Sequence, residues 1–147
     1  MNLLLAVDPG GTTGFSWGSL DTGTFIEAGQ LPPYEFCQMA HKKADSLRGN
    51  LSIVCERFTI TARTLKVSRG GSYDALEVIG VLRYMSLGYC GRDLTFQQPA
   101  DVMKLFDDER LRRLGWYQKG QGHANDSIRH LAYFLARAGK LTIPTTS

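Results

Sequence analysis

The sequence contains few cysteines, and their spacing matches no metal site. Three occur among the 147 residues, at Cys37, Cys55 and Cys90. They are far apart and odd in number, and neither a CxxC pair nor the Cys/His spacing of a zinc site is present. The cysteines therefore indicate small buried thiols in a reducing compartment and exclude a disulfide framework.

Long apolar runs are also missing. The run near the start, Leu3 to Val7, is too short for a signal peptide or a membrane span. No other segment approaches the roughly 18 apolar residues that a span requires. The chain is 43% hydrophobic and 21% charged, which is typical of a globular domain. We expect a single cytoplasmic domain over residues 1–147 with no membrane contact.

Acidic residues are missing from one segment in particular. The formal net charge is +3, but residues 57–73 carry no acid at all. Their basic residues are Arg57, Arg63, Lys66 and Arg69. A second basic cluster is formed by Arg110, Arg112 and Arg113. Such clusters are typical of surfaces that contact a phosphate backbone, although a modest basic excess also occurs on surfaces that bind nothing.

Apolar patterns and turn residues divide the chain into strands and helices. A buried strand ends at the turn Asp8-Pro9-Gly10-Gly11, and Asp21-Thr22-Gly23 indicates an antiparallel hairpin. The predicted strands are residues 3–7, 14–19, 24–29, 51–55 and 94–98. The predicted helices are 34–48, one from about 74 through at least 85, 99–106 and 123–138. This order predicts an α/β fold, in which a mixed five-stranded sheet of leading antiparallel and later parallel strands is flanked by helices.

Some local features carry separate predictions. Asp74 is a good N-cap for the second helix, with Glu77 three residues on. Gly70-Gly71 reads as a hinge before it. Residues 107–122 are rich in charge and glycine, so we expect a polar connection there without regular structure.

Three carboxylates stand at informative places in this order. Asp8 ends the first strand, Glu56 ends the fourth, and Asp126 lies in the first turn of the last helix. If the first and fourth strands are parallel neighbours, Asp8 and Glu56 emerge at the edge of the sheet where ligands bind in α/β folds. Three converging acids repel one another unless cations neutralise them, and Mg²⁺ prefers such oxygen ligands. Two such ions can drive phosphodiester hydrolysis.

The last helix strengthens this hypothesis. Its apolar stripe should pack on the sheet, whereas His123 and Asp126, at i and i+3, share a different face. Simpler roles stay open for each residue. Asp8 could initiate a turn, Glu56 could be a solvated strand end, Asp126 could complement the helix dipole, and His123 could be an exposed histidine. The apolar stripe consists of Ala124, Ile128, Leu131, Ala132, Leu135 and Ala138.

Several segments, in order and at compatible spacing, resemble the RuvC-type Holliday junction resolvases of the RNase H-like superfamily. Residues 7–15 resemble the family's first-strand motif, in which Asp-Pro-Gly leads to a Thr-Gly that begins the second strand. Val54-Cys55-Glu56 is similar to its strand ending in a metal-binding glutamate. Residues 98–104 are similar to its proline-initiated helix with a lysine, and His123-Ala124-Asn125-Asp126 to its closing motif. Residues 72–80 resemble the intervening helix.

The resemblance implies an RNase H-like fold and a homodimer that binds four-way DNA junctions and cuts two opposed strands. It also implies two Mg²⁺ or Mn²⁺ ions in each active site. The implied metal-binding and catalytic residues are Asp8, Glu56, His123 and Asp126. Lys104 is implied as a phosphate contact.

The chain departs from the family near the glutamate. The family usually has an aromatic residue three positions beyond it, whereas here Phe58 lies two beyond and Thr59 takes the third place. The segment over residues 57–73 is also compact. Both differences favour a broader activity on branched DNA, as in phage-encoded relatives, for which the compartment is the host-cell cytoplasm. The candidate DNA-binding residues are Arg57, Phe58, Arg63, Lys66, Arg69 and Lys104.

Other functions fit part of the pattern. An RNase H or YqgF-like nuclease of the same fold would act on RNA or an RNA–DNA hybrid. The run from Asp8 to Gly14 also resembles the first phosphate loop of actin-like ATPases, but no second glycine-rich phosphate motif follows an apolar strand. A catalytically silent DNA-binding module is a third possibility. For the homodimer, we expect the helix near Asp74 to supply the interface through Leu76, Val81 and Tyr84, with Gly80 allowing close approach.

Overall fold

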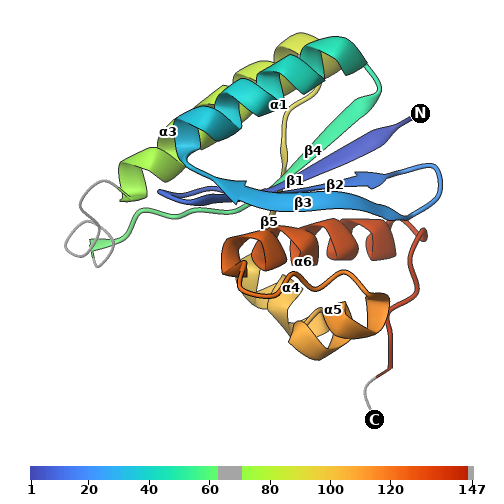
Figure 1. The fold of residues 1–147 in the computed structure, drawn as a ribbon. Coiled ribbons are helices and arrows are strands. Elements are labelled where there is room, and N and C mark those ends of the chain that lie inside the picture. The colour runs from blue at the N-terminus through green and yellow to red at the C-terminus, as the bar shows by residue number, and fades with distance from the viewer. Residues whose placement is uncertain (63–70, 146–147) are drawn as a thin grey trace.

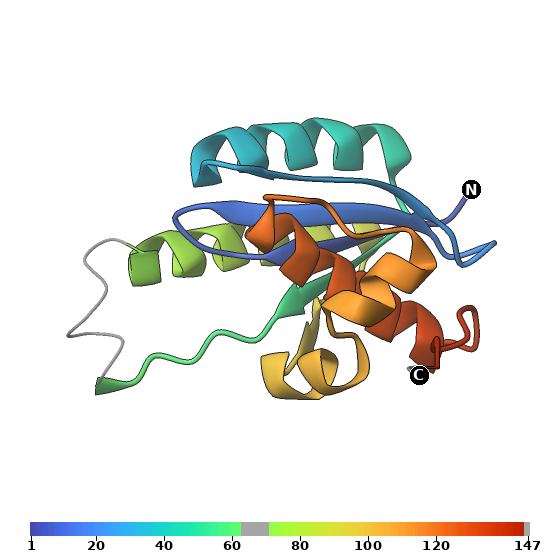
Figure 2. The ribbon, with the colours of Figure 1, turned by 60° about the horizontal axis from the view of Figure 1, so that its bottom comes forward.

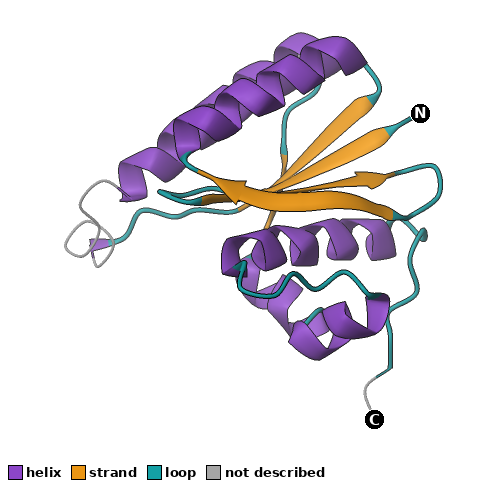
Figure 3. Ribbon diagram, in the orientation of Figure 1, coloured by secondary structure: helices purple, strands orange, loops and turns teal. Residues whose placement is uncertain are grey.

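The five strands form one sheet in the order β3-β2-β1-β4-β5, with helices on both faces (Figures 1 and 3). The computed structural model describes residues 1–62 and 71–145. The strands are β1 (Leu3–Asp8), β2 (Thr13–Ser19), β3 (Phe25–Leu31), β4 (Leu51–Glu56) and β5 (Thr95–Gln97). The helices are α1 (Pro33–Leu47), α3 (Gly71–Met85), the π-helical η1 (Ser86–Cys90), α4 (Pro99–Leu105), α5 (Asp108–Leu114) and α6 (Gly122–Arg137).

Strand pairing confirms the predicted mixed sheet. The first three strands are antiparallel neighbours, because β2 pairs with both β1 and β3 in that sense. On the other side of β1, the strands β4 and β5 run parallel to it. The predicted neighbourhood of the first and fourth strands is therefore confirmed, and the arrangement agrees with the RNase H-like layout.

The alternation of β1 separates two cores, because successive side chains of a strand point to opposite faces. On one face, Leu3, Leu5 and Val7 belong to a core shared with α1 and α3. On the other face, Leu4 and Ala6 pack with Leu131 and Leu135 of α6. Figure 2 turns the lower part of the molecule forward, where α6 lies over β1 and β2. Asp8 has the same parity as Leu4 and Ala6 and therefore emerges on the α6 face.

Helix α6 packs on the sheet as its apolar pattern predicts. Its residues Ala124, Ile128, Leu131, Ala132 and Leu135 are fully buried. Ala138 is the exception, since the helix ends at Arg137 and Ala138 is exposed. The helices α4 and α5 follow on the side of α6 away from the sheet (Figure 1).

A glycine lets α6 begin directly against the sheet. Gly14 of β2 is the register partner of Asp8. A Cβ atom at Gly14 would lie 1.8 Å from the carbonyl oxygen of His123, which no side chain could accommodate. The absence of a side chain at Gly14 therefore allows the first turn of α6 to pack next to Asp8, which explains the glycine at this position.

Three local predictions are corrected by the structure. Residues 107–122 are not an irregular connection, because they contain α5. Asp107 caps this helix by accepting a hydrogen bond from the Arg110 amide at 2.9 Å, and Gly115 ends it at a φ of 77°. Helix α3 begins at Gly71, so Asp74 lies in its first turn and is not the N-cap, and Gly71 belongs to the helix instead of a hinge. Gly70 lies outside the described residues.

The remaining predicted boundaries differ from the observed ones by one or two residues, and η1 extends α3 where no helix was predicted. The three cysteines are free, with Cys55 buried and Cys37 and Cys90 half-buried. In the part of the chain that the structure describes, no helix combines the length and apolar character needed to cross a membrane.

Candidate metal centre

Strand register brings three polar side chains into a row at the carboxyl ends of β1, β4 and β5. Val7 pairs with Cys55, one position before Asp8 and Glu56, and Glu56 pairs with Gln97. Because each of the three follows the parity of the α6-facing residues, all lie beneath the first half of α6. Asp8 and Gln97 are buried, and the Glu56 side chain is 24% exposed.

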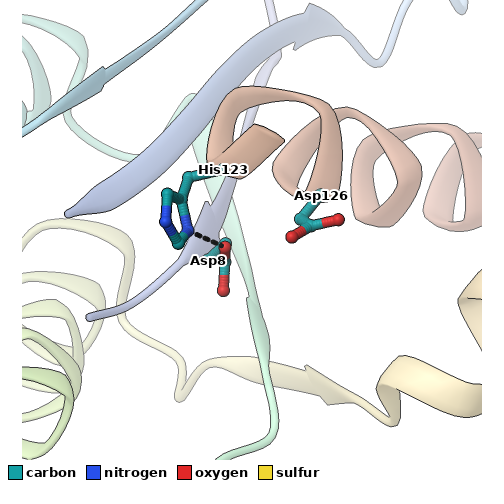
Figure 4. Close-up of side chains that lie close together, drawn as sticks. All are labelled: Asp8, His123 and Asp126. Atoms are coloured by element: carbon teal, nitrogen blue, oxygen red, sulfur yellow. Dashed lines mark hydrogen bonds and ion pairs between the residues drawn. The ribbon is translucent and has the colours of Figure 1, made fainter. Parts of the chain in front are cut away.

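The first turn of α6 adds two further groups to this row. The Nδ1 atom of His123 lies 3.1 Å from Oδ2 of Asp8. Figure 4 shows His123 and Asp126 reaching from the start of α6 toward Asp8 at the end of β1. These three residues each offer one ligand atom, and the three atoms lie within 4.8 Å of one another. The predicted sharing of one helix face by His123 and Asp126 is confirmed.

Glu56 adjoins this group through Asp8. Its carboxyl group shares a hydrogen bond with that of Asp8, although it is not one of the three residues whose ligand atoms converge within 4.8 Å. The structure thus brings all four predicted residues to one place, with Asp8 in contact with both Glu56 and His123.

The electrostatics of the cluster centre on Asp8. Burial, with the nearby Glu56 and Asp126 carboxylates adding to it, raises the pKa of Asp8 from 3.8 to about 9. Burial also acts to raise the pKa of Glu56, but hydrogen bonds with His130 and Asp8 outweigh it and the pKa is lowered. The pKa of Asp126 is raised, mainly by burial, while Arg129 opposes the rise. The raised pKa therefore favours the protonated form of Asp8 at neutral pH, with Glu56 as its hydrogen-bond partner.

The simpler roles for Asp8, Glu56 and Asp126 do not describe their surroundings, whereas His123 is exposed, as its simpler role predicts. The turn after β1 is closed by Thr13, whose hydroxyl donates to the Gly10 carbonyl at 2.9 Å, while the side chain of Asp8 points toward His123. Glu56 is largely enclosed instead of solvated at a strand end. Asp126 is engaged by Arg129 beyond any effect on the helix dipole.

Three residues of this centre were not predicted. His130 is 1% exposed, with Nδ1 2.9 Å from Oε1 of Gln97 and Nε2 3.4 Å from Oε1 of Glu56. Arg129 donates from Nη1 to Oδ1 of Asp126 at 2.7 Å. The sequence carries a signal for His130, because residues 123, 126 and 130 follow the i, i+3, i+7 spacing of one helix face. Nothing in the pattern indicates Gln97.

Of the candidate DNA-binding residues, the structure describes Arg57, Phe58 and Lys104, and none of these three belongs to the cluster. Arg57 directly follows Glu56, is exposed, and places its guanidinium 5.2 Å from the centre of the Phe96 ring. Phe58 is half-buried, and Lys104 is exposed in the last turn of α4. Arg63, Lys66 and Arg69 lie outside the described residues.

No family model and no curated protein matches the chain. Function is therefore inferred from the residues and their geometry.

Proposed function

We propose that the protein is a metal-dependent endonuclease that cleaves four-way DNA junctions and, more broadly, branched DNA. The observation that carries the proposal is the convergence of Asp8, His123 and Asp126, with Glu56 against Asp8, at the carboxyl ends of parallel strands. Clustered carboxylates of this kind support two-metal phosphodiester hydrolysis.

The donor set fits hard divalent cations. Three carboxylates suit Mg²⁺, and the single imidazole suits Mn²⁺ at least as well. Burial raises the pKa of Asp8, and the nearby Glu56 and Asp126 carboxylates add to the rise, so a divalent cation at this place would offset the cost of ionising Asp8. Asp8, Glu56, His123 and Asp126 would hold the ions. When bound, two such ions supply Lewis-acid polarisation of the phosphate and a water nucleophile at neutral pH.

The chain's own residues fix how a substrate would approach. The side chains of His123 and Asp126 are 51% and 39% exposed, whereas that of Asp8 is 10% exposed. The open side of the cluster therefore faces solvent at the first turn of α6. Asp8, which contacts both Glu56 and His123, is the central member of the group that would hold the ions.

Two hollows that share Tyr117 lie on this side of the cluster, and cations line the second. A hollow lined by Asp126, Asn125 and Tyr117 adjoins the cluster. Tyr117 also lines a second hollow, together with Arg112 and Lys119. The Arg112 guanidinium stacks 4.2 Å from the centre of the Tyr117 ring. An aromatic ring beside cations is suited to a nucleic-acid strand, since the ring can stack on bases and the cations can contact phosphates.

Dimerisation is part of the proposal, because paired cuts in a near two-fold symmetric junction require two active sites. Helix α3 exposes an apolar face at Tyr73, Leu76 and Tyr84, which are 60%, 38% and 77% exposed. A Cβ atom at Gly80 would meet nothing within 4 Å. Val81 does not belong to this face, since it packs against the monomer core.

The mass in solution tests this part of the proposal. Sedimentation at micromolar concentration should report about twice 16.3 kDa, and Tyr84→Glu should lower that mass toward the monomer. A strict monomer that still makes paired symmetric cuts would exclude the proposed dimer.

The test of the activity is a substrate panel. Labelled four-way junction, three-way flap, linear duplex and RNA–DNA hybrid are incubated with the protein, with and without Mg²⁺ or Mn²⁺. We expect metal-dependent cleavage of the junction and flap, lost in Asp8→Asn and retained in the control Asp45→Asn, which alters an exposed acid of α1. Preferential cutting of the hybrid would instead identify an RNase H-like activity on RNA.

A further inference from the structure

Two consecutive buried residues of α6 contact the two carboxylates that flank Asp8. Arg129 donates to Asp126 at 2.7 Å, and Nε2 of His130 lies 3.4 Å from Oε1 of Glu56. Both side chains approach from the protein interior, since their exposures are 8% and 2%. They therefore leave the open side of the cluster free.

We propose that Arg129 and His130 are positioning residues that hold Asp126 and Glu56 in a metal-binding arrangement before any ion arrives. The inference rests on the proposed function only in taking the carboxylate cluster to be a divalent-cation site. Neither residue is placed among the ligands, and each acts through the carboxylate that it contacts.

The contacts of Arg129 leave it little freedom. Its Nε donates to the Phe106 carbonyl at 2.9 Å, and its other nitrogens bond to Asp126 and Asp108. A guanidinium is a planar fork whose donors have fixed directions, so three acceptors on three segments define its place. The Asp126 carboxylate is fixed in turn, and its position is tied to the start of α5 through Asp108.

His130 is fixed in a corresponding way from the other side. Nδ1 lies 2.9 Å from Oε1 of Gln97 in β5, so both ring nitrogens have a partner and the ring plane is set by the sheet. Neighbours of this kind, which orient a ligand without touching the metal, typically change metal affinity by about 10–100-fold when they are removed.

Packing alone does not account for the two residues. They stand between Ile128 and Leu131, both fully buried, on a helix whose sheet-facing residues are otherwise largely apolar. Burying a guanidinium and an imidazole is costly unless each is fully hydrogen-bonded, and an apolar side chain would avoid that cost. Arg129 and His130 instead hold the carboxylates of Asp126 and Glu56 beside Asp8, although these acids repel one another.

The test measures metal binding without substrate. Titration calorimetry with Mn²⁺ compares the wild-type chain with Arg129→Met, His130→Leu and the conservative His130→Gln, which keeps a side-chain donor. The control is Arg137→Met, an exposed arginine later in the same helix. Thermal unfolding in EDTA is recorded for each variant.

We expect the Kd for Mn²⁺ to rise about 10–100-fold in Arg129→Met and His130→Leu. His130→Gln should stay within a few-fold of wild type, and the control should be unchanged. Folded variants that bind Mn²⁺ as tightly as wild type would overturn the inference, and so would a wild type that binds no Mn²⁺. If His130→Leu does not fold, equal Kd values for Arg129→Met and wild type would still overturn it. Failure of the substrate panel with intact Mn²⁺ binding would count against the nuclease alone.

Discussion

Replacing Asp8 with asparagine should stabilise the metal-free protein at neutral pH, even though it removes the central residue of the site. The pKa of Asp8 is raised from 3.8 to about 9, so the folded protein takes up a proton that the unfolded chain does not hold between these values. A group whose pKa is higher in the folded protein than in the unfolded chain contributes fully to the free energy of unfolding at pH values below its unfolded-state pKa. This contribution is lost as the pH rises toward the folded-state pKa. Asparagine cannot ionise and so avoids this loss.

The size of the gain follows from the pH window. Each unit between the pH and the unfolded pKa costs about 1.4 kcal/mol, so at pH 7 the wild type loses up to about 4 kcal/mol. If Asp8→Asn recovers half of this upper limit, the gain of about 2 kcal/mol in the free energy of unfolding would raise the Tm by about 4–8 °C for a chain of this size. The Asn amide can still donate to Glu56, so the hydrogen bond between the two side chains is kept.

Thermal unfolding by circular dichroism, in EDTA at pH 5, 6, 7 and 8, measures this effect. The Tm of Asp8→Asn should exceed that of wild type by a margin that widens with pH, while the control Asp45→Asn shows no such trend. Mn²⁺ should stabilise the wild type and have little effect on Asp8→Asn. A margin independent of pH, or an asparagine variant that is less stable throughout, would refute the proposed protonation of Asp8.

Three further predictions concern the packing, the metal preference and the DNA surface. Gly14→Ala should push the start of α6 away from the sheet, lower the free energy of unfolding by about 1–3 kcal/mol and weaken Mn²⁺ binding. Gly88→Ala is the control, because a Cβ atom at Gly88 would meet nothing within 4 Å. Equal Tm values for the two variants would contradict this packing. Mn²⁺ should support faster cleavage than Mg²⁺ in wild type, and His123→Asp should keep much of the Mg²⁺ activity; an inactive but folded variant would indicate that His123 transfers a proton instead. Arg57→Ala and Arg112→Ala are introduced into the Asp8→Asn variant, so that the junction is bound but not cut. Each should reduce the slope of the logarithm of the binding constant against the logarithm of the salt concentration by about one unit, whereas Lys42→Ala on α1 serves as a control. Unchanged slopes would place the DNA elsewhere.

The sequence predicts the framework of this site because its signals are local. An apolar run that ends in an acid places Asp8 and Glu56 at strand ends, and the i, i+3 spacing places His123 beside Asp126. Their convergence further depends on parallel pairing of β1 and β4. The predicted order of strands and helices is compatible with this pairing, and the register of the two strands establishes it.

The features that the sequence does not reveal depend on contacts between distant elements. Gln97 and His130 meet because β5 adds to the sheet in one register beneath α6, and no periodicity specifies that register. Helix α5 has one fully buried residue, Leu111, and is defined mainly by its caps, so its polar composition resembles a loop. Asp74 looks like an N-cap by residue type, yet α3 has already begun three residues earlier.

We propose that the cluster of Asp8, Glu56, His123 and Asp126 cleaves branched DNA with divalent metal. Single-turnover cleavage of an end-labelled four-way junction tests it most directly, with wild type, Asp8→Asn and Asp45→Asn compared in EDTA, Mg²⁺ and Mn²⁺. We expect paired cuts in opposed strands by wild type and Asp45→Asn only when metal is present, and none by Asp8→Asn, which still binds the junction. Metal-independent cutting, or cutting by Asp8→Asn at the wild-type rate, would contradict it.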